Sequence, residues 1–279
     1  MPTAWIHWDP SPNAFTIPYI NHPVKWYGVL FAIGFFVSYW LFSRMLRQAF
    51  PQVKEETRNF LIERLTWFIM VGTVVGARLG HVFFYDFPYY LSHPIEIFKV
   101  WEGGLASHGG VIGILLSVYA FQRFYKSKIP ELSFLSLLDM LAPLAVLTGA
   151  FIRLGNFINQ EIIGTPSTLP WAVQFGHPAE GGLLTTRHPV QLYELLAYLF
   201  TFSVVFYLWK KKHHFLPAGS FTALIFIMAF TFRMILEFFK ATQASALLPG
   251  TYLQAGQILS IPCIIGGIIL LLSLNYKRT

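Results

Sequence analysis

The feature that most constrains this chain is a series of about seven apolar stretches, each close to the length of a membrane-spanning helix. A helix needs about 20 predominantly apolar residues to cross the hydrocarbon core of a bilayer. Backbone groups in lipid must find partners within their own segment, so such stretches form helices. We therefore predict an all-α integral membrane protein, a bundle of about seven transmembrane helices. They are expected near residues 25–46, 60–85, 107–123, 134–153, 190–210, 218–239 and 257–275.

The composition favours the membrane over a soluble helical core. Apolar residues make up 55% of the chain and charged residues only 12%, whereas typical soluble domains carry about 25% charged residues. The 20 basic and 13 acidic side chains are too few to cover the apolar surface. The single cysteine, Cys263, lies in the last apolar stretch and forms no internal disulfide.

The distribution of Lys and Arg predicts the orientation, since cytoplasmic loops carry an excess of both. If the C-terminus is cytoplasmic, 13 of the 20 basic residues fall on the cytoplasmic side. We therefore expect the N-terminus outside. Most of the net charge of +7 comes from this cytoplasmic group of basic residues. We see no basic surface on a soluble segment that would bind nucleic acid. The cytoplasmic group comprises Arg44, Arg47, Lys54, Arg58, Arg64, Arg123, Lys126, Lys128, Lys210, Lys211, Lys212, Lys277 and Arg278.

We expect one polytopic membrane domain, residues 1–279, with two small extracytoplasmic segments. Residues 1–23 are rich in aromatic side chains and proline, as "WIHWDPSPNAFTIPYI" shows, and Trp and Tyr concentrate at membrane interfaces. This segment is predicted to be an outer interfacial arm. Residues 157–188 form the longest outer loop, or head segment, and loops of that length tend to be functional.

A polar run, "GAFIRLGNFINQEIIG" at 149–164, ends the fourth apolar stretch. On a continuing helix, Arg153, Asn156, Phe157, Gln160 and Glu161 would share one stripe. Arg153 could simply snorkel to the headgroup layer. The amides and the carboxylate favour another interpretation, in which they orient the guanidinium and leave its fork free to bind a phosphate.

Two other arginines lie at membrane depth, where an ionisable side chain is costly and suggests a function. Arg233 and Glu237 are four residues apart and can pair. They form either a structural ion pair or a second phosphate ligand held by Glu237. Arg78 and His81, three residues apart, leave the same two alternatives open.

Two further ionisable residues and a set of glycines complete the polar features of the spans. His108 opens the third span and is either a hydrogen-bonded structural group or a general base. Asp139 is expected to form a buried structural contact with a neighbouring span. Glycines recur four apart within 72–80 and at 109–113, which allows close helix–helix approach.

Other chemistries lack their motifs: the chain has no HExxH, cysteine cluster, GxSxG, Walker A or GxGxxG sequence. What remains is a lipid-embedded pocket with arginines near the outer leaflet, which suits an anionic phospholipid headgroup. A competing interpretation is an anion carrier that uses Arg78, Arg153 and Arg233. Carriers usually show paired repeats, and we find no internal symmetry.

Seven blocks of this sequence, in the same order, resemble the prolipoprotein diacylglyceryl transferase family of bacteria. The resemblance covers essentially the whole chain, and the block at 153–164 is the most specific. The blocks are "WYG" (26–28), "GARLGHVFFYD" (76–86), "VWEGGLASHGGVIG" (100–113), "RLGNFINQEIIG" (153–164), "RHPVQLYE" (187–194), "FRMILEFFK" (232–240) and "GQILSIP" (256–262).

The resemblance implies an enzyme of the cytoplasmic (inner) membrane that performs the first step of lipoprotein maturation. The lipobox cysteine of a prolipoprotein signal peptide attacks the diacylglyceryl group of phosphatidylglycerol. A thioether forms and glycerol phosphate leaves. No metal or cofactor is implied, and the partners are the lipid, the precursor and the bilayer.

The resemblance also implies site residues. Those expected to be catalytic are Tyr27, His108, Arg153 and Arg233. Those expected to bind substrate are Arg78, Arg153, Asn156, Glu161, Gly164, His188, Glu194 and Glu237. A free thiol is mostly protonated at neutral pH, so the thiol needs a base, which is either His108 or a group polarised by an arginine.

This sequence departs from the family pattern in three places. Lys25 stands where a histidine is common before "WYG". After Glu237 the chain reads "FFKATQAS", where relatives often have Arg followed by Pro-Asp-x-Gln. The segment between Gly164 and His188 is shorter than in some relatives, so docking of the precursor is expected to differ there.

Overall fold

The computed structural model describes residues 6–19, 21–179, 181, 184–241 and 254–276. The α-helices are α1 (Trp26–Ala49), α2 (Glu55–Phe84), α3 (Phe87–Ser92), α4 (Ser107–Tyr125), α5 (Phe134–Ile158), α6 (Val190–Lys212), α7 (Ser220–Leu236) and α8 (Ala255–Tyr276). Three 3-10 helices are η1 (Pro94–Phe98), η2 (Val100–Glu102) and η3 (Glu237–Phe239). The strands are β1 (Ile6–Trp8), β2 (Asn13–Ile17), β3 (His22–Lys25), β4 (Val173–Phe175) and β5 (Thr186–Arg187).

The predicted all-α membrane architecture is confirmed. Each of the seven apolar stretches coincides with a long helix, namely α1, α2, α4, α5, α6, α7 and α8. Six candidate spans among the described residues are long and apolar enough to cross a membrane. The 19-residue α4 is not among those six, so the count of seven is approximate.

The helices gather into two compact units, and each is described by itself. The larger unit comprises residues 1–42 and 139–279, and the smaller unit comprises residues 43–138. Helix α1 therefore begins in the larger unit and ends in the smaller one.

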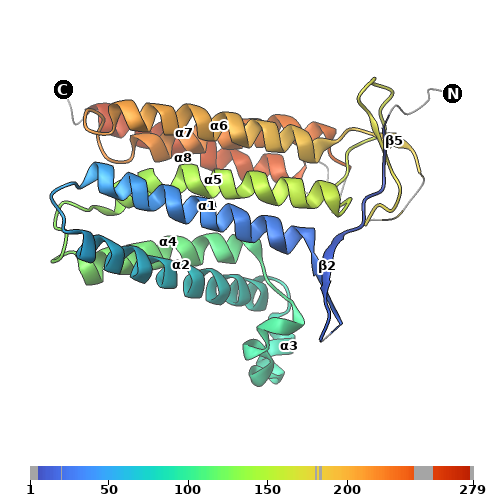
Figure 1. The fold of residues 1–279 in the computed structure, drawn as a ribbon, viewed down its shortest axis with the longest axis horizontal. Helices are drawn as coiled ribbons and strands as arrows, with labels where there is room; N and C mark the ends of the chain where they lie inside the picture. The colour runs from blue at the N-terminus through green and yellow to red at the C-terminus, as the bar shows by residue number, and fades with distance from the viewer. Residues whose placement is uncertain (1–5, 20, 180, 182–183, 242–253, 277–279) are drawn as a thin grey trace. The chain divides into compact units, whose positions relative to one another are not determined.

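In the larger unit, α7 packs against both α6 and α8 along their lengths (Figure 1). Helix α1 meets α5 through a polar contact, in which the Ser38 hydroxyl lies 2.9 Å from that of Thr148. The contact is close because Gly34 has no side chain where Phe151 approaches. Small and hydroxyl side chains are what membrane helices use to pack closely.

Asp139 joins α5 to the beginning of α7, as the sequence predicted for a structural role. Its carboxylate is buried and accepts hydrogen bonds from the backbone N–H groups of Gly219 and Thr222, each at 2.7 Å. The Thr222 hydroxyl donates a third bond of 2.7 Å. The first N–H groups of a helix have no partner within that helix, so a carboxylate from α5 caps α7 and stabilises it.

In the smaller unit, α2 and α4 pack side by side (Figure 1). The glycines predicted to allow close approach are at this contact. A Cβ at Gly76 would collide with the Gly109 carbonyl, and one at Gly80 with the Gly109 Cα. A Cβ at Gly72 would meet the Ser117 hydroxyl. The helix backbones therefore touch, and the prediction is confirmed.

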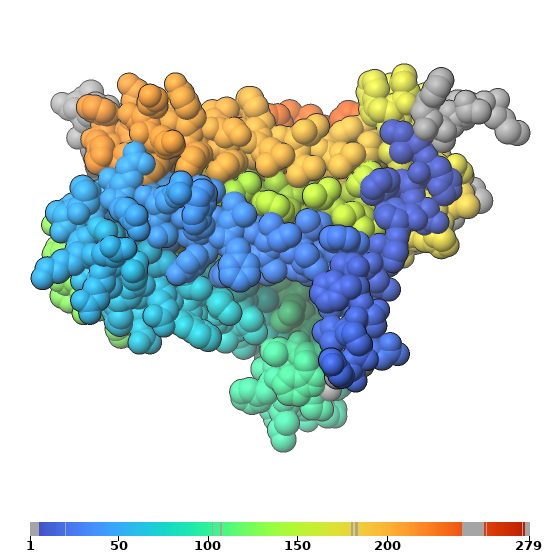
Figure 2. Space-filling view, in the orientation of Figure 1, coloured from blue at the N-terminus to red at the C-terminus, as the bar shows by residue number. Residues whose placement is uncertain are grey.

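The arm and the head segment contain short strands that the sequence analysis treated as irregular. Strand β4 lies between β1, which is parallel to it, and β5, which is antiparallel. Strands β2 and β3 form a separate antiparallel hairpin. In the space-filling view, blue atoms of the arm lie against the yellow atoms of the head segment, where β1 pairs with β4 (Figure 2).

The prediction that the helix continues through Glu161, with one stripe of polar residues, is wrong, because α5 ends at Ile158. The Glu161 N–H bonds the Asn156 carbonyl at 2.9 Å and the Gln160 N–H bonds the Phe157 carbonyl at 3.3 Å. This pattern, with Gln160 at φ +55°, is a Schellman helix end. Phe157 instead turns into a small apolar core, where its ring stacks on Trp8 with centroids 4.5 Å apart.

The side chain of Gln160 compensates for this unusual backbone conformation. A non-glycine residue in the left-handed region is strained. Gln160 is buried, and its amide nitrogen donates to the Asp9 carboxylate at 3.1 Å while its amide oxygen accepts the His177 N–H at 2.7 Å. It therefore fastens the end of α5 to the arm and to the head segment.

Candidate functional site

Arg153 lies 5 residues before the last residue of α5, with 14% of its side chain exposed. Its Nε atom is 2.9 Å from Glu194 Oε2 on α6. Its Nη1 atom donates to Asn156 Oδ1 at 3.1 Å, and Tyr198 on α6 interacts with the same guanidinium. The guanidinium is thus fixed at Nε by a carboxylate and at Nη1 by an amide, and its remaining hydrogens can bind an oxyanion.

A chain of ion pairs extends from Arg153 across three elements. Glu194, whose side chain is 1% exposed, has its second oxygen 2.8 Å from Lys240 Nζ. Lys240 is also 3.0 Å from Glu237 Oε2. Glu194 Oε1 and Oε2 are buried without a partner in hydrogen-bond geometry. The four side chains are therefore held together by charge at close range and not by aligned hydrogen bonds.

Glu161 joins the same network through amides. Asn156 Nδ2 donates to Glu161 Oε2 at 2.7 Å, and Asn159 Nδ2 donates to Oε1 at 3.1 Å. Gln191 on α6, which is fully buried, donates to the Glu161 carbonyl at 2.7 Å. Asn156 therefore contacts the guanidinium directly, and Glu161 is linked to it through Asn156 across a turn and not along a helix.

Lys240 is the site residue that sequence reasoning missed. Its only sequence signal was a departure from the family pattern after Glu237. The backbone fixes its place, because Lys240 pairs with Gly164 in an antiparallel bridge. The Thr165 N–H bonds the Phe239 carbonyl at 2.9 Å in the same short ladder.

The expected pairing of Arg233 with Glu237 is not what the structure shows. Glu237 pairs with Lys240, and among the described residues no ion pair of Arg233 occurs. Arg233 is half-buried in the last turn of α7 and lies near Cys263 of α8. Glu237 is placed by Gly256, since any Cβ there would collide with its carboxylate.

Two of the predicted residues owe their positions to tight packing at glycines. A Cβ at Gly155 would lie 3.0 Å from the Tyr27 ring, so the glycine lets Tyr27 approach α5 within two residues of Arg153. A Cβ at Gly164 would collide with the carbonyl and side chain of His188. Gly164 therefore serves the site by permitting this contact.

His188 lies in an aromatic cluster at the beginning of α6. Its Nδ1 atom is 3.2 Å from the Tyr193 hydroxyl, which accepts a 2.7 Å hydrogen bond from Trp171 Nε1. The Phe239 ring is 5.1 Å from the His188 ring. Burial lowers the pKa of His188 because the charged imidazolium is poorly solvated there. Burial therefore favours the neutral form of His188.

In the smaller unit, Arg78 is buried and holds the connection between α3 and α4. Its guanidinium lies over the Tyr90 ring, 5.0 Å from the centroid. Its nitrogens donate to the backbone oxygens of Glu96, Ile97, Gly103 and Gly104. His81, three residues on, lies 3.2 Å from the exposed Asp86 carboxylate. These contacts support the structural alternative for both residues.

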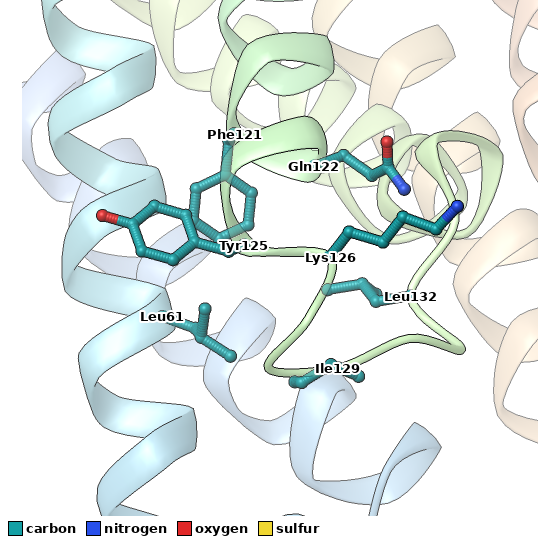
Figure 3. Close-up of a pocket in the computed structure, with 7 residues that line it drawn as sticks. All are labelled: Leu61, Phe121, Gln122, Tyr125, Lys126, Ile129 and Leu132. Carbon is teal, nitrogen blue, oxygen red and sulfur yellow. The ribbon is translucent and has the colours of Figure 1, made fainter.

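His108 lies in the first turn of α4, and its side chain is exposed. The smaller unit also has a hollow at the other end of α4, shown in Figure 3 and lined by Leu61, Phe121, Gln122, Tyr125, Lys126, Ile129 and Leu132. Its polar lining consists of Gln122, Tyr125 and Lys126, and none of the residues predicted for the site lines it. Over the described ranges, no group of three or more His, Cys, Asp or Glu side chains could hold a metal ion.

In the arm, Asp9 forms an exposed cluster with His177 of the head segment. The His177 Nδ1 atom is 2.7 Å from Asp9 Oδ1. Hydrogen bonds from His177 and then Gln160 hold the pKa of Asp9 below its usual range. This cluster fastens arm to head.

Comparison with known proteins agrees with the resemblance seen in the sequence. A family described as prolipoprotein diacylglyceryl transferase matches residues 12–273. A phosphatidylglycerol–prolipoprotein diacylglyceryl transferase of Protochlamydia amoebophila is 40% identical, covering 96% of this chain and 94% of its own length. One of Tolumonas auensis is 44% identical, covering 89% and 90%. One of Chloroherpeton thalassium is 41% identical, covering 96% and 94%.

Proposed function

Because this chain belongs to the prolipoprotein diacylglyceryl transferase family, we propose that it transfers a diacylglyceryl group from phosphatidylglycerol to a cysteine thiol. The acceptor is the lipobox cysteine in the signal peptide of a prolipoprotein. The thiolate sulfur attacks the glyceryl carbon that carries the phosphate, and a thioether bond forms as the carbon–oxygen bond breaks. The thiol proton goes to a base, and glycerol phosphate leaves with the bonding electron pair.

The position of Arg153 is the main support for this proposal. Arg153 lies near the end of an apolar helix, fixed by Glu194 and Asn156, and its remaining donors can bind the phosphate. The attacked carbon is an ordinary alkyl centre, so the reaction depends on stabilising the leaving phosphate. A positioned donor that does so is worth about 3–4 kcal/mol. Arg233, which has no ion pair within the described part of the chain, supplies the second positive charge.

The thiol needs a base, and we propose His108 for this role. The alternative is a group polarised by an arginine. His108 is exposed in the first turn of α4, and histidine is the side chain that most often accepts a proton in catalysis. Tyr27, held against α5 at Gly155, is proposed as a further catalytic group. If His108→Gln kept full activity, the base assignment would fall.

The remaining predicted residues are proposed to shape the headgroup site. Asn156 and Glu161 orient Arg153 through the amide network, and Glu194 orients it through its ion pair. Gly164 and His188 place the segment that packs beside Lys240. The same group includes Glu237, which is held by Lys240. Arg78 is proposed to act indirectly, by fixing the connection that leads to His108.

We propose a bacterial inner-membrane location for the protein, as one polytopic domain with the N-terminus outside. The apolar helices support insertion in a membrane, and the distribution of Lys and Arg supports this orientation. The reaction would then be the first step of lipoprotein maturation, at the outer face of that membrane.

The test is mass spectrometry of a lipobox peptide incubated with the purified protein and phosphatidylglycerol vesicles. The expected result is a diacylglyceryl mass gain on the peptide cysteine that is absent with Arg153→Ala. Arg123→Ala, an exposed arginine of the smaller unit, is the matched control and should keep activity. No mass gain with well-folded protein would overturn the proposal, and anion movement across sealed vesicles would then identify a carrier.

A further inference from the structure

We propose that Lys240 is a positioning residue that sets the charge around Arg153 and thereby the affinity for the phosphate headgroup. This inference rests on the proposed function.

The geometry places Lys240 between two carboxylates. Its Nζ atom is 2.8 Å from Glu194 Oε1 and 3.0 Å from Glu237 Oε2. Only 7% of its side chain is exposed. Burying an unpaired ammonium is very costly, and the two carboxylates give Lys240 the partners that its burial requires.

Charge counting shows what Lys240 does for Arg153. Within the chain of ion pairs, Arg153 and Lys240 balance the charges of Glu194 and Glu237, while Glu161 adds a negative charge that contacts the amides of Asn156 and Asn159. Without Lys240, two carboxylates would face one arginine. Glu194 would then hold Arg153 more strongly, and the surplus negative charge would oppose an incoming phosphate. Charges within a few ångströms in a poorly solvated site interact strongly, so this change should weaken anion binding.

The backbone keeps the ammonium in this position. Lys240 pairs with Gly164 in an antiparallel bridge, and the next N–H, that of Ala241, bonds the Ile163 carbonyl at 3.1 Å. On the other side, the Glu237 carboxylate fits only because position 256 is a glycine. The ammonium therefore lies at a fixed point between α6 and η3.

A purely structural ion pair and a positioning residue predict different kinetics. Loss of a structural pair lowers stability and leaves the KM of the folded enzyme unchanged. Loss of a positioning charge raises the KM for phosphatidylglycerol, because ground-state binding of the phosphate is weakened. The contact between Lys240 and Glu194 lacks hydrogen-bond geometry. The charge of the Lys240 side chain therefore matters more than the exact shape of that side chain.

The experiment measures KM for phosphatidylglycerol, kcat and the thermal midpoint for three variants. Lys240→Met should raise KM roughly tenfold or more. Lys240→Arg should stay within about threefold of the wild type, since it keeps the charge. Lys240→Gln, which also removes the charge but keeps a polar amide, should raise KM by a similar factor. Lys211→Met, an exposed lysine at the end of α6, is the control.

An unchanged KM in folded Lys240→Met or Lys240→Gln protein would overturn the inference. If Lys240→Met does not fold, Lys240→Gln decides, because the inference requires a raised KM in any folded variant that lacks the ammonium. If the wild type transfers no lipid, the proposed function fails separately. Binding of phosphatidylglycerol by native mass spectrometry then tests Lys240 with the same variants.

Discussion

Glu194 offers the sharpest test of how the site works. One buried carboxylate contacts Arg153 at 2.9 Å through one oxygen and Lys240 at 2.8 Å through the other. Glu194→Gln keeps the shape and removes the charge, so it creates no cavity. Both cations then lose their shared partner, while Lys240 keeps Glu237.

The expected loss of stability follows from the burial of the pair. Removing one partner of a buried ion pair costs about 3–5 kcal/mol, because the other charge is left without compensation. That is a large part of the roughly 5–15 kcal/mol by which native proteins are stable. Thermal unfolding in detergent should show a clear decrease for Glu194→Gln. Glu63→Gln, the same substitution at an exposed position of α2, should show almost none.

The expected effect on catalysis is on kcat. The substitution adds one unit of positive charge to the cluster, so ground-state binding of the phosphate is not weakened. The guanidinium of Arg153, however, loses the contact that fixes its Nε edge. We expect kcat to fall about 100-fold, which corresponds to about 2.7 kcal/mol of lost transition-state stabilisation. Initial rates at varied phosphatidylglycerol measure both constants, and a raised KM with unchanged kcat would refute this reasoning.

Two further predictions concern stability. Asp139→Ala should lower the free energy of unfolding by about 3–5 kcal/mol, because it leaves buried donors of α7 without an acceptor. Thr222→Val loses only one hydroxyl bond and should lower the free energy of unfolding by about 1 kcal/mol. Chemical denaturation measures both losses, and equal losses would contradict the capping role of Asp139. Burial lowers the pKa of His188 in the folded protein. As the pH drops below about 6.5, His188 is therefore protonated more readily in the unfolded chain than in the folded protein, and the folded protein should lose stability. His188→Gln should show a smaller difference in thermal midpoint between about pH 7.5 and about pH 5.

The helices could be predicted from the sequence because length and apolarity alone decide them in a membrane. The glycine contacts of α2 with α4 could also be predicted, since their spacing follows helix geometry. The end of α5 could not, because Gln160 takes a left-handed conformation that usually needs glycine. Contacts with Asp9 and His177, more than 15 residues away in sequence, make that conformation tolerable.

The ion-pair network shows the same limit within the site. Spacing on one helix suggested that Glu237 pairs with Arg233, but η3 follows α7 directly and Glu237 reaches Lys240 instead. Local spacing says which pairs are possible on a regular helix. It does not predict a partner from another element, such as Glu194 of α6, which pairs with Lys240.

Glu194 and Lys240 together separate an electrostatic account of the site from a mechanical one. Both residues belong to the same ion pair, so removing either one disrupts the same contact. If the contact serves only to hold α6 and η3 together, Glu194→Gln and Lys240→Met should change the kinetics in the same way. If the charge around Arg153 matters, the two variants move that charge in opposite directions. The KM for phosphatidylglycerol should then rise for Lys240→Met and stay level or fall for Glu194→Gln, although both proteins are less stable.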